Sequence, residues 1–366
     1  MSKLLLFTDN HFCSTSSILR QMGEKYTLRL QNQLDTINWL TKTATENGCS
    51  ELFCLGDFFD SNTLTAQEIS CLSEVDFKEF PVHFIVGNHE MGNVTLDYTS
   101  VHSFLMNKNC TVYNKPAIIG IDNTLIYILP YQLEINRLQN IMDYFPKIDI
   151  PQNIKYKILF THNDISGINM GNFISKEGFS KEDLSNNFDL VVNGHIHNQN
   201  WVTKNILNLG NITGQNFSED TTKYKHQCMI LDCETLQYKL ITNPYALNFS
   251  KLDFTGKNDN IDYINKISSL IGNNAILSIK CNEENVYYIK HRFDPETEED
   301  LLIPRSCNVI KARIIVEKNS TITNVDTAQQ PTQELHLDYL QEFQKYITQE
   351  LGTEDTVLFE LERVLK

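Results

Sequence analysis

The chain has 366 residues, of which 41% are hydrophobic and 21% are charged, and its formal net charge at pH 7 is −15. No apolar run approaches the roughly 20 residues of a membrane-spanning helix, and the run at residues 4–7 is too short for a signal peptide. This composition is typical of a soluble globular protein without membrane contact. The acidic balance argues against binding of nucleic acid by bulk electrostatics alone, although bound cations, a basic patch or a partner protein can supply positive charge to a nuclease.

The nine cysteines are scattered along the chain and include no Cys-x-x-Cys pair. An odd number without paired spacing argues against a disulfide framework. Because thiols stay reduced in the cytoplasm, we expect a cytoplasmic protein whose cysteines are ordinary core or surface residues.

Residues 1–245 alternate short β-rich apolar runs with amphipathic stretches. The first expected strand, residues 4–8, ends at Asp9. Apolar residues at helical spacing from Tyr26 to Ala44 predict a helix, and Gly48 stands where that helix would stop. Later expected strands also run directly into polar residues; they span residues 52–55, 82–86, 158–160 and 190–192. Polar clusters just past strand ends occupy the place where open α/β sheets put their sites.

Two pairs of short runs complete the predicted sheets. Residues 117–121 and 125–129 predict a hairpin that turns at Asp122 and Asn123. Residues 229–232 and 238–242 are expected to close a second sheet. The predicted fold class is α/β, with a β-sandwich flanked by helices.

The character of the sequence changes after Pro244. A strand-like run at residues 251–254, a helical pattern from Ile261 to Ile271, and strands at residues 275–280 and 309–316 predict a small α/β capping domain over residues 246–317. Residues 318–335 are polar, lack strong periodicity and indicate a linker. Residues 336–366 predict two amphipathic helices separated by Gly352. The expected domains are therefore 1–245, 246–317, the linker 318–335 and the helical pair 336–366.

Five short polar motifs follow the expected strands in a fixed order. They are Asp9-Asn10-His11, Gly56-Asp57-Phe58-Phe59-Asp60, Gly87-Asn88-His89-Glu90, Thr161-His162 and Gly194-His195-Ile196-His197. Each motif alone is weak, because a single histidine is more often structural than a metal ligand. All five in order, each after a strand, are highly specific. The other five histidines (His83, His102, His226, His291 and His336) have no partner pattern and are interpreted as ordinary residues.

The side chains in these motifs suit two divalent metal ions. The candidate ligands are Asp9, His11, Asp57, Asn88, His162, His195 and His197. Two metals about 3.5–4 Å apart need a bridging carboxylate, and Asp57 is the natural bridge. Asp9, His11 and His197 would complete one metal shell, and Asn88, His162 and His195 the other. Imidazole, carboxylate and amide ligands together favour Mn²⁺, Fe²⁺ or Zn²⁺ over Ca²⁺ or Mg²⁺.

Such a pair of metals would activate a shared water against a phosphate ester. His89 is not needed as a ligand, and we assign it as the general acid that protonates the leaving oxygen. Asp60 is either the carboxylate partner that keeps His89 protonated or a residue that caps its loop. The glycines at 56, 87 and 194 are expected to let the backbone turn sharply after each strand.

The five motifs resemble the signature of the calcineurin-like metallophosphoesterase superfamily over about residues 1–245. Ser61 and Met91 stand where protein serine/threonine phosphatases carry arginine, and Phe58 stands where purple acid phosphatases carry a tyrosine ligand. The arrangement beyond the motifs is most similar to the nuclease subunit of SbcCD-type double-strand-break repair complexes, especially the shorter bacteriophage recombination endonuclease subunits. Many of those relatives have histidine in place of Asp60 and aspartate in place of Glu90.

The resemblance implies manganese-dependent hydrolysis of DNA, with double-strand exonuclease and single-strand endonuclease activity, in a bacterial or phage-infected cytoplasm. It also implies that residues 246–317 help to recognise DNA and that the C-terminal helices bind the coiled coil of an SbcC-type ABC ATPase. Homodimerisation within a heterotetramer would use helices at residues 65–80 and 95–106. The alternative is a small-molecule phosphodiesterase or phosphatase of the same superfamily. The intact ligand set argues against a structural protein with a decayed site.

Two features have competing interpretations. The apolar faces of the C-terminal helices either pack on the catalytic domain or dock a partner, and the linker favours docking. The basic residues Lys223 and Lys225, next to His226, and the run of Lys290, His291 and Arg292 either face DNA or belong to ordinary solvated surface, which we favour.

Overall fold

The computed structural model describes residues 2–317, apart from 15–18, 20–22, 24, 134–136, 169–173, 304 and 306–308. The chain divides into two compact units, Met1–Lys318 and Asn319–Lys366. The predicted linker and the predicted helical pair lie outside the described residues. Among the described helices, none is long and apolar enough to cross a membrane. Within the described part, free thiols are present at Cys49, Cys54, Cys71, Cys110, Cys228, Cys233 and Cys281.

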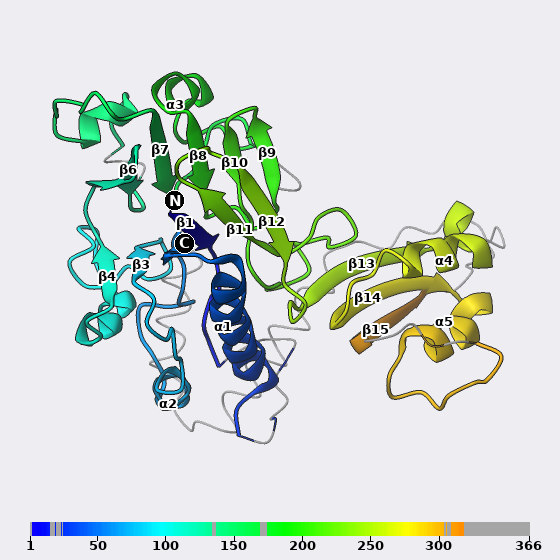
Figure 1. The fold of residues 1–366 in the computed structure, drawn as a ribbon. Coiled ribbons are helices and arrows are strands. Elements are labelled where there is room, and N and C mark those ends of the chain that lie inside the picture. The colour runs from blue at the N-terminus through cyan, green and yellow to red at the C-terminus, as the bar shows by residue number, and fades with distance from the viewer. Residues whose placement is uncertain are drawn as a thin grey trace, which may run out of the picture. The chain divides into compact units, whose positions relative to one another are not determined.

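Two six-stranded sheets form the larger part of the first unit (Figure 1). The first has the order β12-β11-β1-β2-β3-β4, and the second has the order β5-β6-β7-β8-β10-β9. The strands of the first sheet are β1 (Lys3–Phe7), β2 (Glu51–Cys54), β3 (Val82–Ile85), β4 (Cys110–Tyr113), β11 (Gln227–Asp232) and β12 (Tyr238–Thr242). Those of the second are β5 (Ala117–Ile121), β6 (Thr124–Leu129), β7 (Tyr156–Thr161), β8 (Leu190–Asn193), β9 (Asn200–Thr203) and β10 (Ile206–Asn208). The predicted sandwich flanked by helices is confirmed.

The expectation that residues 229–232 and 238–242 close a second sheet is wrong. Strand β11 instead pairs antiparallel with β1 and extends the first sheet, and β12 pairs with β11. The second sheet is completed by β9 and β10, which were not predicted. With four and three residues, these strands are too short to show a clear alternation of apolar and polar side chains.

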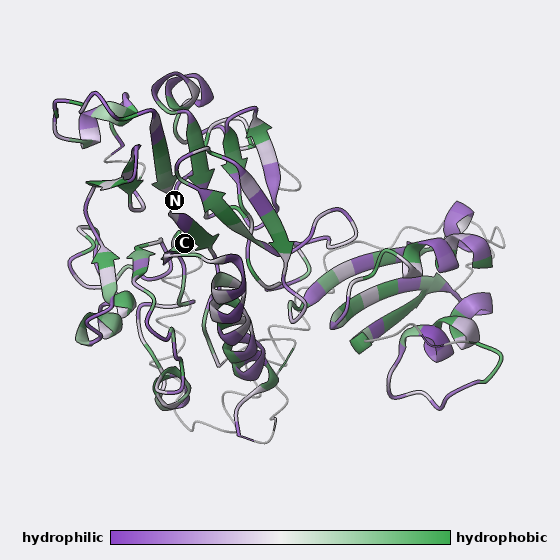
Figure 2. Cartoon of the chain, in the orientation of Figure 1, coloured by the Kyte–Doolittle hydropathy of each residue, from purple (hydrophilic) through white to green (hydrophobic). Residues whose placement is uncertain are grey.

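Side chains alternate between the two faces of the central strands, so a hydrophobic core lies on each side of the first sheet. Leu4 and Leu6 of β1 face the second sheet and pack with residues such as Phe160. Leu5 and Phe7 point the other way, into a core shared with α1 (Leu28–Asn47). Figure 2 shows the resulting concentration of hydrophobic residues along the strands. A short helix, α3 (Lys181–Asn187), covers the outer face of the second sheet and buries Leu184 there.

The helix predicted from Tyr26 to Ala44 is present as α1. The Thr27 side chain accepts a hydrogen bond from the Leu30 amide, which caps the first turn. The helix ends at Gly48, which has a φ of 65° and satisfies the last carbonyl groups through its amide. Both ends of α1 are therefore set by capping residues that can be identified in the sequence.

The helices expected at residues 65–80 and 95–106 are shorter than predicted. The first is α2 (Ala66–Leu72), which begins with a capping box between Thr65 and Glu68. The second is a 3₁₀ helix, η1 (Ser100–Met106). Beyond α2, the Asp76 carboxylate accepts a hydrogen bond from the Lys78 amide at 2.7 Å, and this local turn competes with helix continuation.

The region predicted as a cap, for which that name is kept, contains a three-stranded parallel sheet in the order β13-β14-β15. Its elements are β13 (Asn248–Phe254), α4 (Ile261–Ser268), β14 (Ala275–Asn282), α5 (Val286–Phe293) and β15 (Val309–Glu317). Helices α4 and α5 bury apolar residues against one face of this sheet. Helix α5 was not predicted, and its eight residues include only two buried side chains, Ile289 and Phe293.

Candidate metal centre

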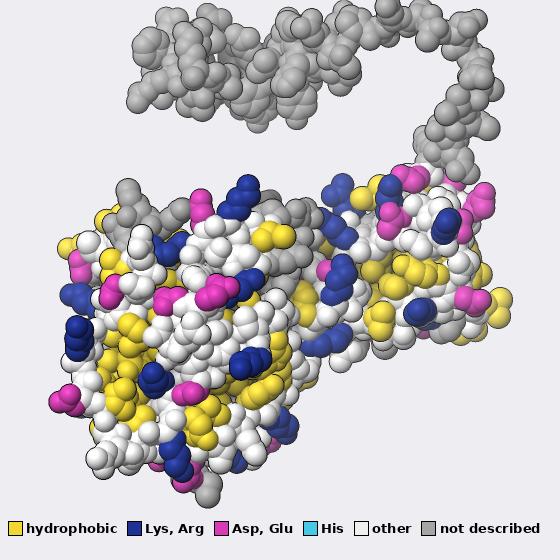
Figure 3. All heavy atoms as spheres, turned by 90° about the horizontal axis from the view of Figure 1, so that it is seen from above, with side chains coloured by type: hydrophobic (Ala, Val, Ile, Leu, Met, Phe, Trp, Pro, Cys, Tyr) yellow, Lys and Arg dark blue, Asp and Glu magenta, His cyan; other side chains and the backbone are white. Residues whose placement is uncertain are grey.

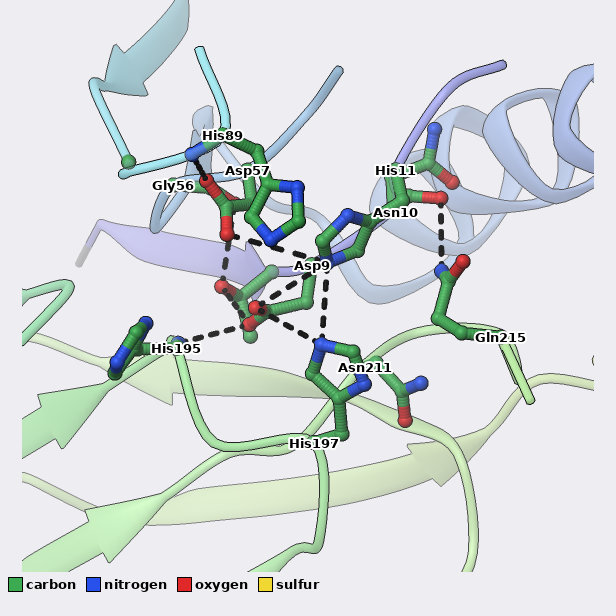
Figure 4. A network of polar contacts seen from close by, with 12 residues as sticks. Asp9, Asn10, His11, Gly56, Asp57, His89, His195, His197, Asn211 and Gln215 are labelled. Atoms are coloured by element: carbon green, nitrogen blue, oxygen red, sulfur yellow. Dashed lines mark hydrogen bonds and ion pairs between the residues drawn. The ribbon is translucent and has the colours of Figure 1, made fainter. Parts of the chain in front are cut away.

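The seven predicted ligands meet where loops from the two sheets converge. Asp9, Asp57 and Asn88 follow β1, β2 and β3 of the first sheet, while His162 and His195 follow β7 and β8 of the second. These five strands run parallel within their sheets, so each sheet presents their carboxyl ends at one edge. Figure 4 shows side chains from both edges pointing toward one another.

The first group of ligands is Asp9, His11 and His197. Their ligand atoms lie within 4.8 Å of one another. The Nε2 atoms of the two histidines are 3.2 Å apart, and each lies 3.8 Å from Asp9 Oδ1. Asp9 Oδ1 is buried and has no hydrogen-bond partner within the described structure. Because buried acceptors are normally satisfied, this atom fits a metal ligand.

The second group is Asp57, His162 and His195, which also form a set within 4.8 Å. Asn88 joins it through its side-chain oxygen, which lies 3.3 Å from His162 Nε2 and 2.9 Å from His195 Nδ1. Asp57 Oδ2 lies 3.0 Å from His162 Nε2 and 4.0 Å from His11 Nε2. Asp57 therefore stands between the two groups, as a bridging carboxylate must.

Four of the ligands adopt a left-handed backbone conformation that is rare for residues with a side chain. Their φ angles are 52° for Asp9, 48° for His11, 48° for Asp57 and 73° for His195. Each such residue costs roughly 1–3 kcal/mol unless its surroundings hold it in place. The loops after β1 and β2 hold each other, because the amides of Asp9 and His11 donate to the carbonyls of Gly56 and Asp57 at 3.0 Å.

The role expected of the three motif glycines needs correction. Only Gly56 has a positive φ, of 106°; Gly87 and Gly194 do not. All three instead leave room for ligands. A Cβ atom would lie 2.2 Å from His162 Nδ1 at Gly56, 2.1 Å from Asp57 Oδ1 at Gly87, and 2.3 Å from the Thr8 hydroxyl oxygen at Gly194. Close packing therefore explains more of these positions than chain turning does.

A hydrogen-bond acceptor fixes each ligating imidazole. Asp60 Oδ1 lies 2.9 Å from His11 Nδ1, Glu219 Oε1 lies 3.1 Å from His197 Nδ1, and the Leu55 carbonyl lies 2.8 Å from His162 Nδ1. These contacts leave Nε2 of all three rings for a metal. His195 has the opposite orientation, because its Nε2 lies 3.1 Å from Asp164 Oδ1 and its Nδ1 faces Asn88. Such acceptors orient metal-binding imidazoles and raise their basicity.

The roles of Asp164, Glu219 and Gln33 were not predicted. Asp164 lies two residues after the candidate ligand His162, and this closeness in sequence is the only feature that could have indicated its role. Glu219 is almost fully buried and reaches His197 from a loop after β10. The Gln33 side chain on α1 accepts a hydrogen bond from the Cys13 amide at 3.1 Å and donates one to the Asn10 carbonyl at 2.9 Å. These two bonds attach the first ligand loop to the helix. Neither of the last two has a local sequence signal.

His89 lies at the edge of the centre, with 42% of its side chain exposed. Its amide donates to Asp57 Oδ1 at 2.9 Å, and its Nδ1 faces the backbone carbonyl of Asp60 at 3.1 Å. The Asp60 carboxylate lies 3.7 Å from His89 Nδ1 and is closer to His11. The geometry thus gives Asp60 a ligand-orienting contact that the sequence did not indicate, in addition to the expected approach to His89.

Glu90 joins two of the ligand loops. It is fully buried, and its carboxylate accepts hydrogen bonds from the Phe59 amide at 3.0 Å and the Gly87 amide at 2.9 Å. Burial, together with the charge of Asp57, raises the pKa of this carboxyl to about 8. A glutamate at this position therefore supports the loops that carry Asp57 and Asn88.

The electrostatics of the site favour bound positive charge. Burial raises the pKa of Asp9, but the imidazoles of His162 and His11 outweigh burial and hold this pKa at about 2. Burial lowers the pKa of His11, yet hydrogen bonds to Asp60 and Asp9 raise it to about 10. Without metals, the buried carboxylates thus retain protons on neighbouring rings. Divalent cations can replace those protons, and the donors of both groups fit two such ions.

The match to a known protein family agrees with this arrangement. A family model described as calcineurin-like phosphoesterase matches residues 2–199. Exonuclease subunit 1 of Enterobacteria phage T4 is 28% identical over 111 residues, which cover 28% of this chain and 33% of that protein. The match therefore spans only about a third of the length of that relative.

Two solved structures are also similar to this chain. An archaeal phosphodiesterase covers 66% of this chain and 99% of its own, with 14% identity and a TM-score of 0.34. A dimetal phosphatase from Danio rerio also covers 66% of this chain and 99% of its own, with 11% identity and a TM-score of 0.38. The family model alone spans more than half of the 366 residues. The chain therefore belongs to the calcineurin-like phosphoesterase family and is a metal-dependent phosphoesterase.

Proposed function

We propose that this protein is a manganese-dependent DNA nuclease and the nuclease subunit of an SbcCD-like recombination or repair complex. The observation that carries the catalytic part of the proposal is the pair of ligand groups that meet at Asp57. Similarity to a protein named exonuclease subunit 1 supports DNA as the substrate. The imidazole, carboxylate and amide donors support Mn²⁺ as the metal.

The residues of the site have different roles in phosphodiester hydrolysis. Two divalent metals, when bound, lower the pKa of a shared water and stabilise charge on the phosphate. Asp57 Oδ2 holds the position between the two groups, and the acceptors behind the imidazoles keep them aimed inward. His89 Nδ1 faces a carbonyl, so Nε2 is the ring nitrogen available to the leaving oxygen. His89 donates the proton that the leaving alcohol requires.

A small-molecule phosphodiesterase is the second candidate, and one observation favours it. The net charge of −15 repels a polyanion. A small phosphate diester needs only the metal centre and its immediate surroundings. The two candidates share their chemistry and differ in the surface that surrounds the site.

Hydrolysis of two substrates separates these candidates. The full chain is incubated with Mn²⁺ and either linear double-stranded DNA or bis(p-nitrophenyl) phosphate, with Asp57→Asn as the matched variant that keeps shape but removes the bridging charge. We expect both substrates to be cut by the wild type and neither by the variant. Hydrolysis of the small ester with DNA left intact after long incubation, with or without an SbcC-type ATPase, would contradict the nuclease proposal.

Homodimerisation is proposed through the surface formed by α2, η1 and the loops between them. A groove of about 580 Å³ between these helices is lined by Leu64, Ile69, Leu72, Ser73, Val75, Phe77, Ser103, Phe104, Met106 and Asn107. Ile69 is 57% exposed and Met106 is 91% exposed. Because large exposed apolar side chains that cluster together usually mark an interaction surface, a second copy of this chain is the proposed occupant. Sedimentation of Met106→Glu as a monomer, beside a dimeric wild type, is the expected result.

The proposed heterotetramer pairs this dimer with an ABC ATPase of the SbcC type, whose coiled coil would bind residues 336–366. The support for this proposal is the amphipathic pattern of the tail, which follows the polar residues 318–335 in the sequence. Such helices bind partners by inserting an apolar face into a groove or a bundle.

A further inference from the structure

His195 is oriented differently from the other three candidate ligand histidines. His11, His162 and His197 leave Nε2 for a metal, whereas His195 turns Nδ1 toward Asn88 and places Nε2 3.1 Å from Asp164 Oδ1. A half-turn of this ring about its Cβ–Cγ bond would exchange Nδ1 for a carbon atom, which cannot bind a metal. The contribution of His195 to the second group therefore depends on the carboxylate that holds its Nε2.

The Asp164 carboxylate needs support of its own. Its side chain is 24% exposed, so water competes with the His195 ring for its oxygen atoms. The second oxygen, Oδ2, lies 3.3 Å from Nη2 of Arg137, a residue between β6 and β7. Each carboxylate oxygen thus has its own partner, an imidazole on one side and a guanidinium on the other. Charge-assisted contacts of this kind fix both the position and the rotation of a carboxylate.

The backbone of Asp164 is already fixed by the neighbouring loop. The Phe179 amide donates to the Asp164 carbonyl at 2.9 Å. A Cβ atom at Gly178 would lie 2.5 Å from that carbonyl oxygen, so the two segments are in close contact. The freedom that remains to Asp164 is rotation of its side chain, and this rotation is what Arg137 restricts.

Arg137 is a buried cation, which makes the contact with Asp164 mutual. On the face of the molecule shown in Figure 3, Lys and Arg side chains project at the surface, where water solvates their charge. The Arg137 side chain is 9% exposed, and its guanidinium carbon lies 5.4 Å from the centroid of the Phe179 ring. A buried charge that loses its partner is strongly destabilising, so Asp164 also holds Arg137 in place.

We propose that Arg137 is a positioning residue for the second group of metal ligands and acts through Asp164 on His195. Arg137 holds the Asp164 carboxylate in the rotamer that accepts a hydrogen bond from His195 Nε2. The ring then presents Nδ1 beside Asn88, where the second metal would bind. This inference concerns the metal centre alone and applies whether the substrate is DNA or a small phosphate diester.

Three single variants of the full chain separate the charge of Arg137 from its packing. Arg137→Met keeps an unbranched side chain against Phe179 but removes the charge, whereas Arg137→Lys keeps the charge. The matched control is Lys181→Met, which removes one positive charge from α3, where Lys181 Nζ donates to the Gly167 carbonyl at 2.8 Å. Isothermal titration with Mn²⁺ gives the affinity for each ion, and electron paramagnetic resonance distinguishes a coupled Mn²⁺ pair from isolated ions. Thermal unfolding checks that each variant is folded.

We expect the wild type to bind two Mn²⁺ ions and to show the spectrum of a coupled pair. Arg137→Met should bind one of the two ions about 10–100-fold more weakly, because a carboxylate behind a ligand has lost its support. At limiting Mn²⁺ its spectrum should be that of isolated ions. Arg137→Lys should lose less affinity than Arg137→Met, and Lys181→Met should match the wild type. Wild-type affinity for both ions in Arg137→Met, or an equal loss in Arg137→Lys, would overturn the proposal.

A double-mutant cycle tests whether Arg137 acts through Asp164. Asp164→Asn should weaken binding of the same ion, and adding Arg137→Met should weaken it no further, because both changes remove one interaction. Additive losses would show that Arg137 acts independently and would overturn the proposal. If Arg137→Met alone does not fold, the double variant and Asp164→Asn still decide the question.

The number of bound ions separates this proposal from the proposed nuclease function. A wild type that binds a single Mn²⁺ ion would overturn the second group of ligands and the role of Arg137 with it. Two bound ions without cleavage of DNA would contradict the nuclease function only, and the comparison of Arg137→Met with wild type would stand.

Discussion

His89 differs from the four candidate ligand histidines in its exposure. All five rings have one nitrogen on an acceptor, which is the Asp60 carbonyl for His89. The His89 side chain is 42% exposed, whereas those of His195 and His197 are 16% and 25% exposed. A ring held by one nitrogen at the edge of the site can deliver a proton from the other. Its contribution therefore depends on how much the leaving group needs that proton.

Replacement of His89 by glutamine tests this role. We expect DNA cleavage to fall by about 10²–10⁴, because the alkoxide leaving group needs a proton. Hydrolysis of bis(p-nitrophenyl) phosphate should fall far less, because nitrophenolate leaves without one. The measurement is kcat for both substrates at saturating Mn²⁺, and equal losses on both would remove His89 from the acid role.

Asp60 can act on His11, on His89 or on both, and one substitution separates these roles. We expect Asp60→Asn to weaken Mn²⁺ binding by about 10–100-fold, because an amide no longer supports the His11 ring as a carboxylate does. Isothermal titration with Mn²⁺ measures this effect, with the exposed Asp97→Asn as the control. If Mn²⁺ affinity stays at the wild-type value while DNA cleavage alone declines, Asp60 acts through His89 instead.

At the scale of elements, the site depends on loops that are hydrogen-bonded to one another and to α1. Gln33 of α1 binds the backbone on both sides of His11, while Arg29, one turn earlier and fully buried, donates to the Gly214 carbonyl and the Gln215 side chain. One helix therefore holds the first ligand loop and the loop that carries Glu219. This explains how a chain segment with several left-handed residues keeps a single conformation.

Because the ligand loops pack closely, a methyl group added between them is expected to destabilise the protein more than one added on an open strand. Gly87→Ala would place Cβ 2.1 Å from Asp57 Oδ1, so we expect a loss of about 1–3 kcal/mol in the free energy of unfolding and at least tenfold weaker Mn²⁺ binding. Gly120→Ala in β5 is the control, because its Cβ would meet nothing within 4 Å. Chemical denaturation and metal titration measure both effects, and a Gly87→Ala protein with wild-type Mn²⁺ affinity would show that the loops can move apart freely.

At the scale of the whole molecule, the metal centre and the proposed ATPase-binding tail belong to different parts of the chain. The first compact unit ends at Lys318, and residues 319–366 form the second unit. We expect deletion of residues 336–366 to abolish binding of an SbcC-type ATPase while Mn²⁺-dependent hydrolysis of bis(p-nitrophenyl) phosphate continues. Co-sedimentation with the ATPase and an ester assay measure these outcomes. A truncated protein that fails to fold would show instead that the tail packs on the catalytic domain.

The sequence by itself determined the candidate ligands, because metal chemistry restricts the side chains at each position and the strands that precede them have a clear apolar pattern. Asp9, Asp57 and His195 could be recognised in this way before any contact was known. The limits of α1 were also determined locally, since the Thr27 cap and the Gly48 stop act within a few residues of the helix ends.

Only the tertiary structure decided which distant groups support those ligands. Glu219 reaches His197 and Gln33 reaches the loop around His11 across gaps of 22 residues each. Such contacts form only after the chain has folded and leave no periodic signal. The sheet that β11 joins was decided in the same way, because strand pairing depends on which edges remain available when the layers pack.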